Sequence, residues 1–293
     1  MYKFLITLTV LFFSACTFDD TSHIKELMLK AEKQVSHEGT IHKNVVYKST
    51  LFHNVELDIY EPLTLKYTKA PIYIYIHGGS WLRGDKALVN VYDKTVQGLR
   101  EQGIAVVSIN YRFVSQSGIS AMISDCLDAV KYVQEHAIQY GLDAHTIGLH
   151  GHSSGANLAL VTGLTLSKHN SDVIFIVDEY GPTDVLKLLK EQEDRVWWTY
   201  LIADSSLEAL SPVLVVHPNV PPVYIAHGDA DKTVPVEQSK SLYMLLQKSK
   251  IPSSFTVVHG AKHGYRGIDD AAVQRHRKEV LFFMLDKYSS ASK

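Results

Sequence analysis

Residues 146–156 read TIGLHGHSSGA, and this stretch decides the fold. The apolar run that ends at His150 is typical of a strand, and the small residues after Ser153 are typical of a helix start. Gly151 and Gly155 stand two residues before and two after the serine. A tight strand-to-helix turn crowds its own backbone, so glycines are needed there, and the turn exposes the hydroxyl. The stretch therefore predicts a nucleophilic serine; a plain turn is the alternative.

Strands and helices alternate on both sides of this turn. Strands are expected at 44–47, 55–60, 71–76, 104–109, 146–150, 173–177, 223–226 and 255–258, and helices at 119–140, 156–167 and 273–288. This order predicts an α/β fold whose mostly parallel central sheet carries helices on both faces, with the opening hairpin at an antiparallel edge. Gly141 is a plausible cap for the first helix. In such a sheet, ligands bind beyond the carboxyl ends of the strands.

A second glycine-rich segment follows the expected strand at 71–76. It reads HGGSW at residues 77–81. An alkoxide that develops during attack on a carbonyl needs backbone N–H groups without internal partners, and glycines leave room for its approach. Gly79 and Ser80 are the candidate donors of this oxyanion hole, joined by the N–H of Ser154. A turn without chemistry is the alternative.

A serine hydroxyl is a poor nucleophile unless a base removes its proton and an acid orients that base. Asp229 and Asp231 both lie on the loop after the strand at 223–226. Physical reasoning leaves both open as the acid. For the base, His259 ends the last strand and His263 lies on the loop beyond it. A loop residue has more freedom to reach the serine, which favours His263.

The bulk composition excludes several classes of function. The chain has 293 residues, a net charge of −2 and 20% charged residues. It lacks the basic stripe that nucleic-acid binding requires. There are 15 histidines but no HExxH motif or paired Cys/His spacing, so no metal and no other cofactor is expected. Residues 41–290 are expected to form one domain.

The N-terminus is expected to be an export signal rather than part of the domain. The apolar run at 4–13 is too short to span a bilayer. Cys16 follows two small residues, as in bacterial lipoprotein signals, so residues 1–16 predict lipidation and 17–40 a tether. A secretory peptide with an incidental cysteine is the alternative. The prediction is a periplasmic or cell-surface protein whose membrane contact is a lipid at Cys16, with no disulfide to Cys126.

A cap insertion over the site is expected at about 185–218. Trp197 and Trp198 lie within it. Two interpretations stay open: these rings form a wall for an acyl or aryl group, or they pack the cap onto the domain. Trp81, beside the oxyanion loop, is expected to line the pocket. Arg112 is expected to hold that loop through hydrogen bonds.

Four ordered motifs carry a family resemblance: HGGSWLRGDK, GHSSGANLAL, HGDADKTVPVEQS and GAKHGY. Together they resemble the α/β-hydrolases grouped with hormone-sensitive-lipase-type and feruloyl- or acetylxylan-type esterases, from about Val45 to Tyr288. In that family the acid is the Asp of Gly-x-x-Asp-x-x-Val-Pro, which implies Asp231 here. Ser80 stands where lipase-type relatives often have a third glycine. The resemblance is therefore closer to the esterase and arylformamidase branches.

The resemblance implies a triad of Ser153, Asp231 and His263 and a carboxylic ester hydrolase that works through an acyl-enzyme. Short-chain, aryl or sugar esters, as small molecules or saccharides, are the expected substrates. An amidase, arylformamidase or peptidase with the same triad is the first alternative, because triad and oxyanion hole serve both bond types. A catalytically silent binding protein on the same fold is a remote one.

Overall fold

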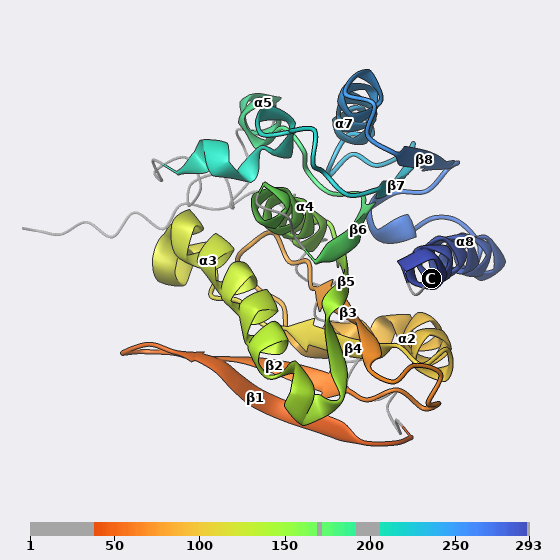
Figure 1. Cartoon of the computed structure of the whole chain (residues 1–293). Coiled ribbons are helices and arrows are strands. Elements are labelled where there is room, and N and C mark those ends of the chain that lie inside the picture. Colours follow the sequence, from red (N-terminus) through yellow and green to blue (C-terminus); the bar gives the residue numbers. More distant parts are fainter. Residues whose placement is uncertain (1–37, 169–171, 192–205, 292–293) are drawn as a thin grey trace, which may run out of the picture.

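The protein is described from a computed structural model that covers residues 38–168, 172–191 and 206–291. Within these ranges one sheet has the strand order β1-β2-β4-β3-β5-β6-β7-β8 (Figure 1). The strands are β1 Ile41–Ser49, β2 Asn54–Tyr60, β3 Ala70–Ile76, β4 Ala105–Ile109, β5 Leu142–His152, β6 Val173–Glu179, β7 Val223–Gly228 and β8 Ser253–Val258. Each strand expected from the sequence is present.

The sheet is antiparallel at one edge and parallel elsewhere. Strand β2 pairs antiparallel with both β1 and β4, whereas β4, β3, β5, β6, β7 and β8 pair parallel with their neighbours. The predicted α/β architecture with an antiparallel opening hairpin is confirmed. Because parallel strands end at the same edge, the loops after β3, β5, β7 and β8 meet there.

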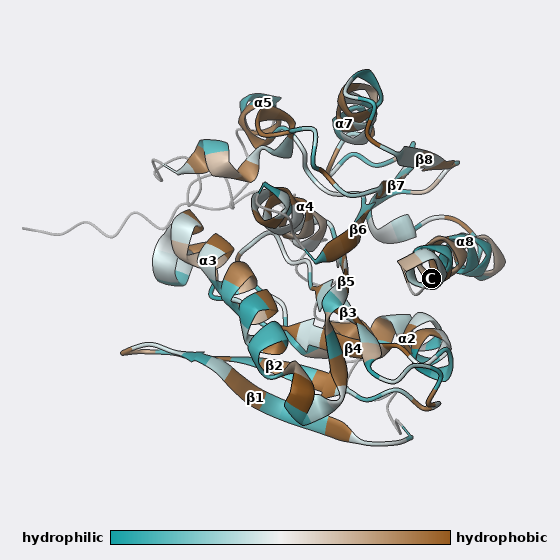
Figure 2. Ribbon diagram, viewed as in Figure 1, coloured by the Kyte–Doolittle hydropathy of each residue, from teal (hydrophilic) through white to brown (hydrophobic). Residues whose placement is uncertain are grey.

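Helices cover both faces of the sheet (Figure 1). They are α2 Asp93–Glu101, α3 Val114–Glu135, α4 Ser154–Ser167, α5 Val185–Glu191, α7 Glu237–Lys248 and α8 Asp270–Ala291. Short 3-10 turns are η1 Lys86–Tyr92, η2 Ala137–Tyr140, η3 Leu207–Leu210, η4 Pro212–Leu214 and η5 His263–Tyr265. One core lies under α3, α4, α5 and α7, and a second lies under α2 and α8. Figure 2 shows hydrophobic residues along β4 and β6, which lie on either side of the two central strands, as strands buried on both faces require.

The helices differ from expectation in two respects. Helix α3 begins at Val114 instead of 119, because a kink at Gly118, with φ 77°, joins an extra turn to it. It is followed by a 3-10 turn that Gly141 ends in the left-handed conformation, as expected of a cap. Helices α2 and α7 were not expected. In α2 only Val96 and Leu99 are buried apolar residues, too few to mark a helical period.

Some expectations fall on residues that the structure does not describe. Residues 1–37, with the export signal and Cys16, lie outside the described ranges, as do Trp197 and Trp198 in 192–205. Elements α5, η3 and η4 lie in the region where the cap was expected. Among the described helices none combines the length and the apolar character that crossing a membrane takes. Cys126 is buried as a free thiol.

Candidate active site

The turn between β5 and α4 holds Ser153 in a conformation that side chains rarely adopt. Its φ is 55° and its ψ is −125°. The turn is also tightly packed: a Cβ on Gly151 would lie 2.2 Å from the Gly155 carbonyl oxygen, and one on Gly155 would lie 2.1 Å from that of Ile76. Both glycines are therefore required by close backbone approach. Strain of this kind persists only where the surrounding structure fixes it, and it is typical of nucleophile turns.

Ser153, His263 and Asp231 form a continuous chain of contacts. His263 Nε2 lies 2.9 Å from Ser153 Oγ, and His263 Nδ1 lies 2.7 Å from Asp231 Oδ2. The serine comes from the end of β5, the aspartate from the loop after β7 and the histidine from the loop after β8. This order of serine, acid and base along the chain and around the sheet is that of the triad on this type of sheet.

The carboxylate of Asp231 is held as an anion. Burial by itself raises its pKa, but the charge of the His263 ring and hydrogen bonds from His227 and His263 outweigh burial and hold the pKa well below its usual range. Its Oδ1 also accepts the backbone N–H groups of Thr233 and Val234, at 2.8 and 3.0 Å. A fixed anion of this kind orients an imidazole and stabilises its protonated form.

The second aspartate and histidine on these loops pair with each other. His259 Nδ1 lies 2.8 Å from Asp229 Oδ2, and the Gly260 N–H donates to Asp229 Oδ1 at 2.7 Å. The His259 side chain is 86% exposed. The alternatives that the sequence left open are thus separated in space, with Asp231 beside His263 and Asp229 beside His259.

The oxyanion loop after β3 has an unusual backbone. Gly79, Ser80 and Trp81 all have positive φ, at 132°, 56° and 59°. The N–H groups of Leu82 and Arg83 donate to the Gly79 carbonyl, which closes the turn. Such a run of positive φ values points successive N–H groups away from regular secondary structure.

Two of the three expected oxyanion residues, Ser80 and Ser154, line a small cavity beside Ser153. Among the described residues it has a volume of about 10 Å³, with room for about one water molecule. It is lined by Ser80, Trp81, Ser153, Ser154, Pro182, Leu188, Thr233 and Val234. Gly79 does not line it. Ser154 is the first residue of α4, where an N–H has no partner within the helix.

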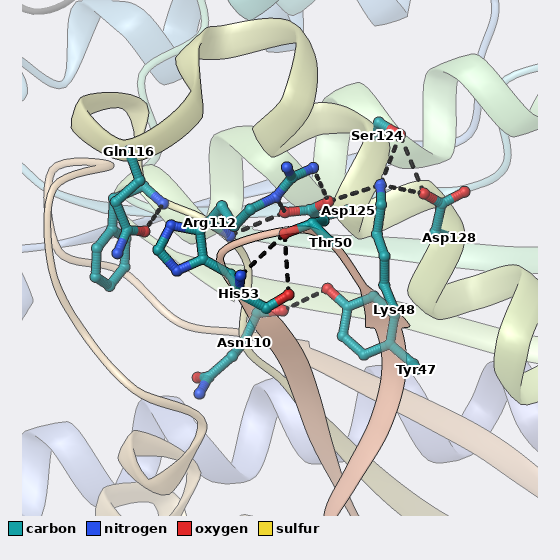
Figure 3. A network of polar contacts seen from close by, with 11 residues as sticks. Tyr47, Lys48, Thr50, His53, Asn110, Arg112, Gln116, Ser124, Asp125 and Asp128 are labelled. Atoms are coloured by element: carbon teal, nitrogen blue, oxygen red, sulfur yellow. Dashed lines mark hydrogen bonds and ion pairs between the residues drawn. The ribbon is translucent and has the colours of Figure 1, made fainter.

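Arg112 does not hold the oxyanion loop, so that expectation is wrong. Within the described structure its guanidinium binds Asp125 of α3 through Nε and Nη2, at 2.8 and 2.7 Å, and Lys48 of β1 joins the same carboxylate at 2.8 Å (Figure 3). The Asp125 carboxylate projects from the middle of α3 and lies between Arg112 and Lys48. The segment after β4 reaches the oxyanion loop instead through Val114, whose N–H donates to the Trp81 carbonyl at 2.9 Å.

His227 is a residue of this site that sequence reasoning missed. It is fully buried at the end of β7. Its Nε2 lies 2.8 Å from the Val234 carbonyl and 3.3 Å from Asp231 Oδ2, and its Nδ1 lies 2.7 Å from Ser239 Oγ. His227 therefore fixes both sides of the acid loop. The available signal was its position directly after a buried strand.

The fold and the site define the class of protein. A mostly parallel sheet with helices on both faces, a strained serine between β5 and α4, and an aspartate and a histidine after the last two strands are the α/β-hydrolase arrangement. The chain belongs to the BD-FAE family, whose model matches residues 57–246.

Curated relatives are similar to most of this chain. A probable isoprenylcysteine alpha-carbonyl methylesterase of Arabidopsis thaliana is 29% identical over 231 residues, which is 71% of this chain and 48% of the relative. The chain thus spans about half the length of that relative. An acetyl esterase of Salmonella typhi is 28% identical over 239 residues, 74% of this chain and 71% of its own length.

Solved structures share the fold. A truncated form of a carbohydrate esterase from gut microbiota is 27% identical with a TM-score of 0.70, covering 86% of this chain and 97% of its own. Esterase B from Lactobacillus rhamnosis has a TM-score of 0.77 over 93% of this chain and 94% of its own, at 19% identity. The second likeness is one of fold alone.

Proposed function

We propose that the protein is a serine hydrolase that cleaves carboxylic esters with short acyl groups. The contact chain from Asp231 through His263 to Ser153, with distances of 2.7 and 2.9 Å, carries this proposal. It is the relay that nucleophilic attack by a serine requires. The similarity to an acetyl esterase and to a carbohydrate esterase supports an ester as the substrate.

The proposed reaction has two steps. His263 Nε2 accepts the Ser153 proton while Oγ bonds to the carbonyl carbon, and the imidazolium then gives that proton to the leaving alcohol as the ester bond breaks. Water attacks the acyl-enzyme with His263 again as the base, which releases the acid and restores the serine. Asp231 holds the imidazole and stabilises its charge. The N–H groups of Gly79, Ser80 and Ser154 are the proposed donors to the alkoxide.

The small cavity beside Ser153 supports a short acyl group. In this proposal the acyl chain enters the cavity that Trp81 and Leu188 help to line, whose volume of about 10 Å³ suits a methyl group better than a longer chain. Acetyl esters are therefore the preferred substrates in this proposal. The carbohydrate esterase neighbour supports a sugar as the alcohol side.

A chain-length series of p-nitrophenyl esters, from acetate to octanoate, tests the proposal, with the matched amide p-nitroacetanilide and the Ser153→Ala variant as controls. We expect kcat/KM to be highest for acetate, to fall at least tenfold by octanoate, and to vanish in the variant. Equal rates for octanoate and acetate would contradict the short acyl group. Faster cleavage of the amide than of the ester would contradict the ester.

A pair of neighbouring leucines makes the acyl test sharper. Leu188 lines the cavity, whereas Leu189, also buried on α5, does not. Both alanine variants lose about 2–5 kcal/mol of stability, because each deletes buried methyl groups. Only Leu188→Ala is expected to shift the preferred ester toward butyrate. A shift of equal size in Leu189→Ala would show that loosening of the fold, and not the cavity, sets the preference.

We also propose that the protein is exported and lipidated at Cys16. The apolar run at 4–13 and the small residues before Cys16 support this. The test is fractionation of cells that express the full chain. Wild type is expected in the membrane fraction with a lipid mass on the peptide that begins at Cys16, and Cys16→Ser in the soluble periplasm. Wild type in the cytoplasm would contradict export.

A further inference from the structure

A buried polar cluster lies directly behind the serine turn. His150 and His152 point to the same face of β5, since side chains alternate along a strand, and Glu179 is the register partner of His152 on β6. His276 of α8 closes this face. The glutamate oxygens lie 2.8 Å from His150 Nε2, 3.0 Å from His152 Nε2 and 3.1 Å from His276 Nε2. None of the four side chains is more than 4% exposed.

The charges in this cluster are distributed unequally. Burial raises the pKa of Glu179, but the nearby His152 ring and hydrogen bonds from His150 and His276 outweigh it, so the pKa lies well below its usual range. Burial lowers the pKa of His152 to about 4. At neutral pH the glutamate is thus an anion beside a neutral His152. The carboxylate accepts hydrogen bonds from His150 and His276, and His152 Nε2 lies in polar contact with it at 3.0 Å.

Three members of this cluster, His150, His152 and Glu179, also have the residue types and the spacing of a metal site. The contacts of His150 and His276 with Glu179, at 2.8 and 3.1 Å, fit N–H···O hydrogen bonds, whereas tetrahedral zinc ligands lie about 3.3 Å apart. Within the described residues, both ring nitrogens of His152 and the Nδ1 atom of His276 are buried without a hydrogen-bond partner, so His152 makes a close polar contact with Glu179 and not an aligned hydrogen bond. A metal on Nε2 would place a proton on the buried Nδ1 atoms, although ligating histidines nearly always donate it. The geometry favours a glutamate that accepts hydrogen bonds from His150 and His276 and has His152 in polar contact.

The cluster reaches both sides of the reacting pair. The Ser153 N–H donates to the Glu179 carbonyl at 2.9 Å, and His152 is the residue before the serine. On the other side, the ring of Tyr180, next to Glu179, meets the His263 ring edge-on at 5.0 Å. Tyr265 contacts both Tyr180 and the His276 ring, at 4.9 and 4.7 Å. Glu179 is thus connected to the serine turn through its backbone carbonyl and through His152, and to the base loop through Tyr180 and through His276.

We propose that Glu179 is a positioning residue whose buried carboxylate holds His152 and His276 and thereby fixes Ser153 against His263. The proposal rests on the proposed serine-hydrolase function. A strained turn keeps its conformation only where its surroundings fix it, and the cluster packs directly behind the serine turn. Removing the anion leaves buried histidine N–H groups without an acceptor. Because His152 precedes Ser153, we expect this loss to disturb the serine turn as well as the packing around the cluster.

Two neighbouring carboxyl groups allow a matched experiment. Glu179→Gln puts an amide N–H₂ among histidine N–H donors, and Glu179→Asp keeps the charge on a shorter stem. Asp178→Asn is the control: Asp178 is equally buried and next in sequence, and burial raises its pKa to about 8, so the amide resembles its neutral form. All variants are compared with wild type in kcat and KM for p-nitrophenyl acetate, well below their melting temperatures.

We expect Glu179→Gln to lower kcat at least tenfold with KM changed less than threefold, Glu179→Asp to recover part of kcat, and Asp178→Asn to stay within threefold of wild type. A folded Glu179→Gln protein with wild-type kcat overturns the proposal, as does an equal loss in Asp178→Asn. If Glu179→Gln does not fold, His276→Phe, which removes one donor, takes its place with an expected several-fold loss of kcat, and unchanged kcat overturns the proposal.

Two further outcomes separate the possible failures. Stoichiometric zinc in the purified wild type that is lost in Glu179→Gln overturns the hydrogen-bond interpretation in favour of a metal site. A wild type that neither hydrolyses esters nor reacts with a fluorophosphonate contradicts the proposed function itself. A wild type that is active, with an equally active Glu179→Gln variant, contradicts only the positioning role.

Discussion

Two aspartate–histidine pairs lie on the same two loops. Their hydrogen-bond distances are nearly equal, but they differ in burial and in their contact with Ser153. Asp231 and His263 are 2.7 Å apart, and Asp229 and His259 are 2.8 Å apart. The side chains of the first pair are 0% and 13% exposed, whereas those of the second are 38% and 86% exposed. Only the first pair contacts Ser153.

The comparison shows that a hydrogen bond between a carboxylate and an imidazole is not enough for catalysis. The pair must also be buried and in contact with the serine. The buried pair is fixed by backbone N–H groups and by His227, and low dielectric strengthens the contact. The exposed pair is hydrated and screened by salt. Each of the following changes tests this contrast, from the largest expected effect to the smallest.

The largest effect is expected from removing the two carboxylate charges separately. Asp231→Asn should lower kcat for p-nitrophenyl acetate by about two to four orders of magnitude, because the imidazole loses its orientation and the anion that stabilises its charge. Asp229→Asn should leave kcat within twofold. The matched pair is measured under the same conditions, and the reverse order of effects would show that the wrong aspartate has been assigned.

A smaller loss is expected when the support of the buried pair is removed. His227→Phe keeps a ring of similar size but loses the contact to Asp231. A hydrogen bond to a charged group contributes about 1.5–3 kcal/mol, and only the part that moves His263 affects the reaction, so kcat should fall about tenfold. His259→Phe, the equivalent change at the exposed pair, should not alter kcat. Equal losses in both variants would remove the distinction.

The pH dependence of stability should separate the two pairs as well. Because the folded pKa of Asp231 is lowered, its charge contributes stability above the unfolded pKa of about 4, and this contribution is lost as the pH falls toward the folded pKa. The melting-temperature difference between wild type and Asp231→Asn should therefore shrink from pH 6 to pH 3. A difference that stays constant would mean that the charge is not the cause.

The smallest effect is expected at the exposed pair. Asp229→Asn should change the melting temperature only slightly at low ionic strength, and the change should disappear in 0.5 M salt, since exposed charges are screened. Thermal unfolding at both salt concentrations measures this. A large change that persists in high salt would show that the Asp229–His259 pair has a structural role that its exposure does not suggest.

The sequence predicts those parts of the site where the backbone conformation or its close packing requires a particular residue type. Gly151 and Gly155 mark the serine turn because any Cβ there would collide with the backbone. The choice between Asp229 and Asp231 was not accessible to physical reasoning, because two residues of one loop point to different surroundings only after the loop has folded. The family resemblance pointed to Asp231, the aspartate that the structure places beside His263.

Other features were hidden for a different reason. Glu179 and His276 are 97 residues apart and meet only because α8 packs on the face of β5 and β6. No local pattern reports such a contact. Arg112 and Asp125 are 13 residues apart and meet only because the segment after β4 lies against α3, so the sequence does not reveal this partner either.

The central claim is that Ser153 is the nucleophile that the buried pair activates. It is tested most directly by reaction with a fluorophosphonate followed by peptide mass spectrometry. We predict one adduct, on the peptide that carries Ser153, formed by wild type and by Asp229→Asn, much slower in Asp231→Asn and absent from Ser153→Ala. An adduct on another residue, or none under conditions that label a known serine esterase, would contradict it.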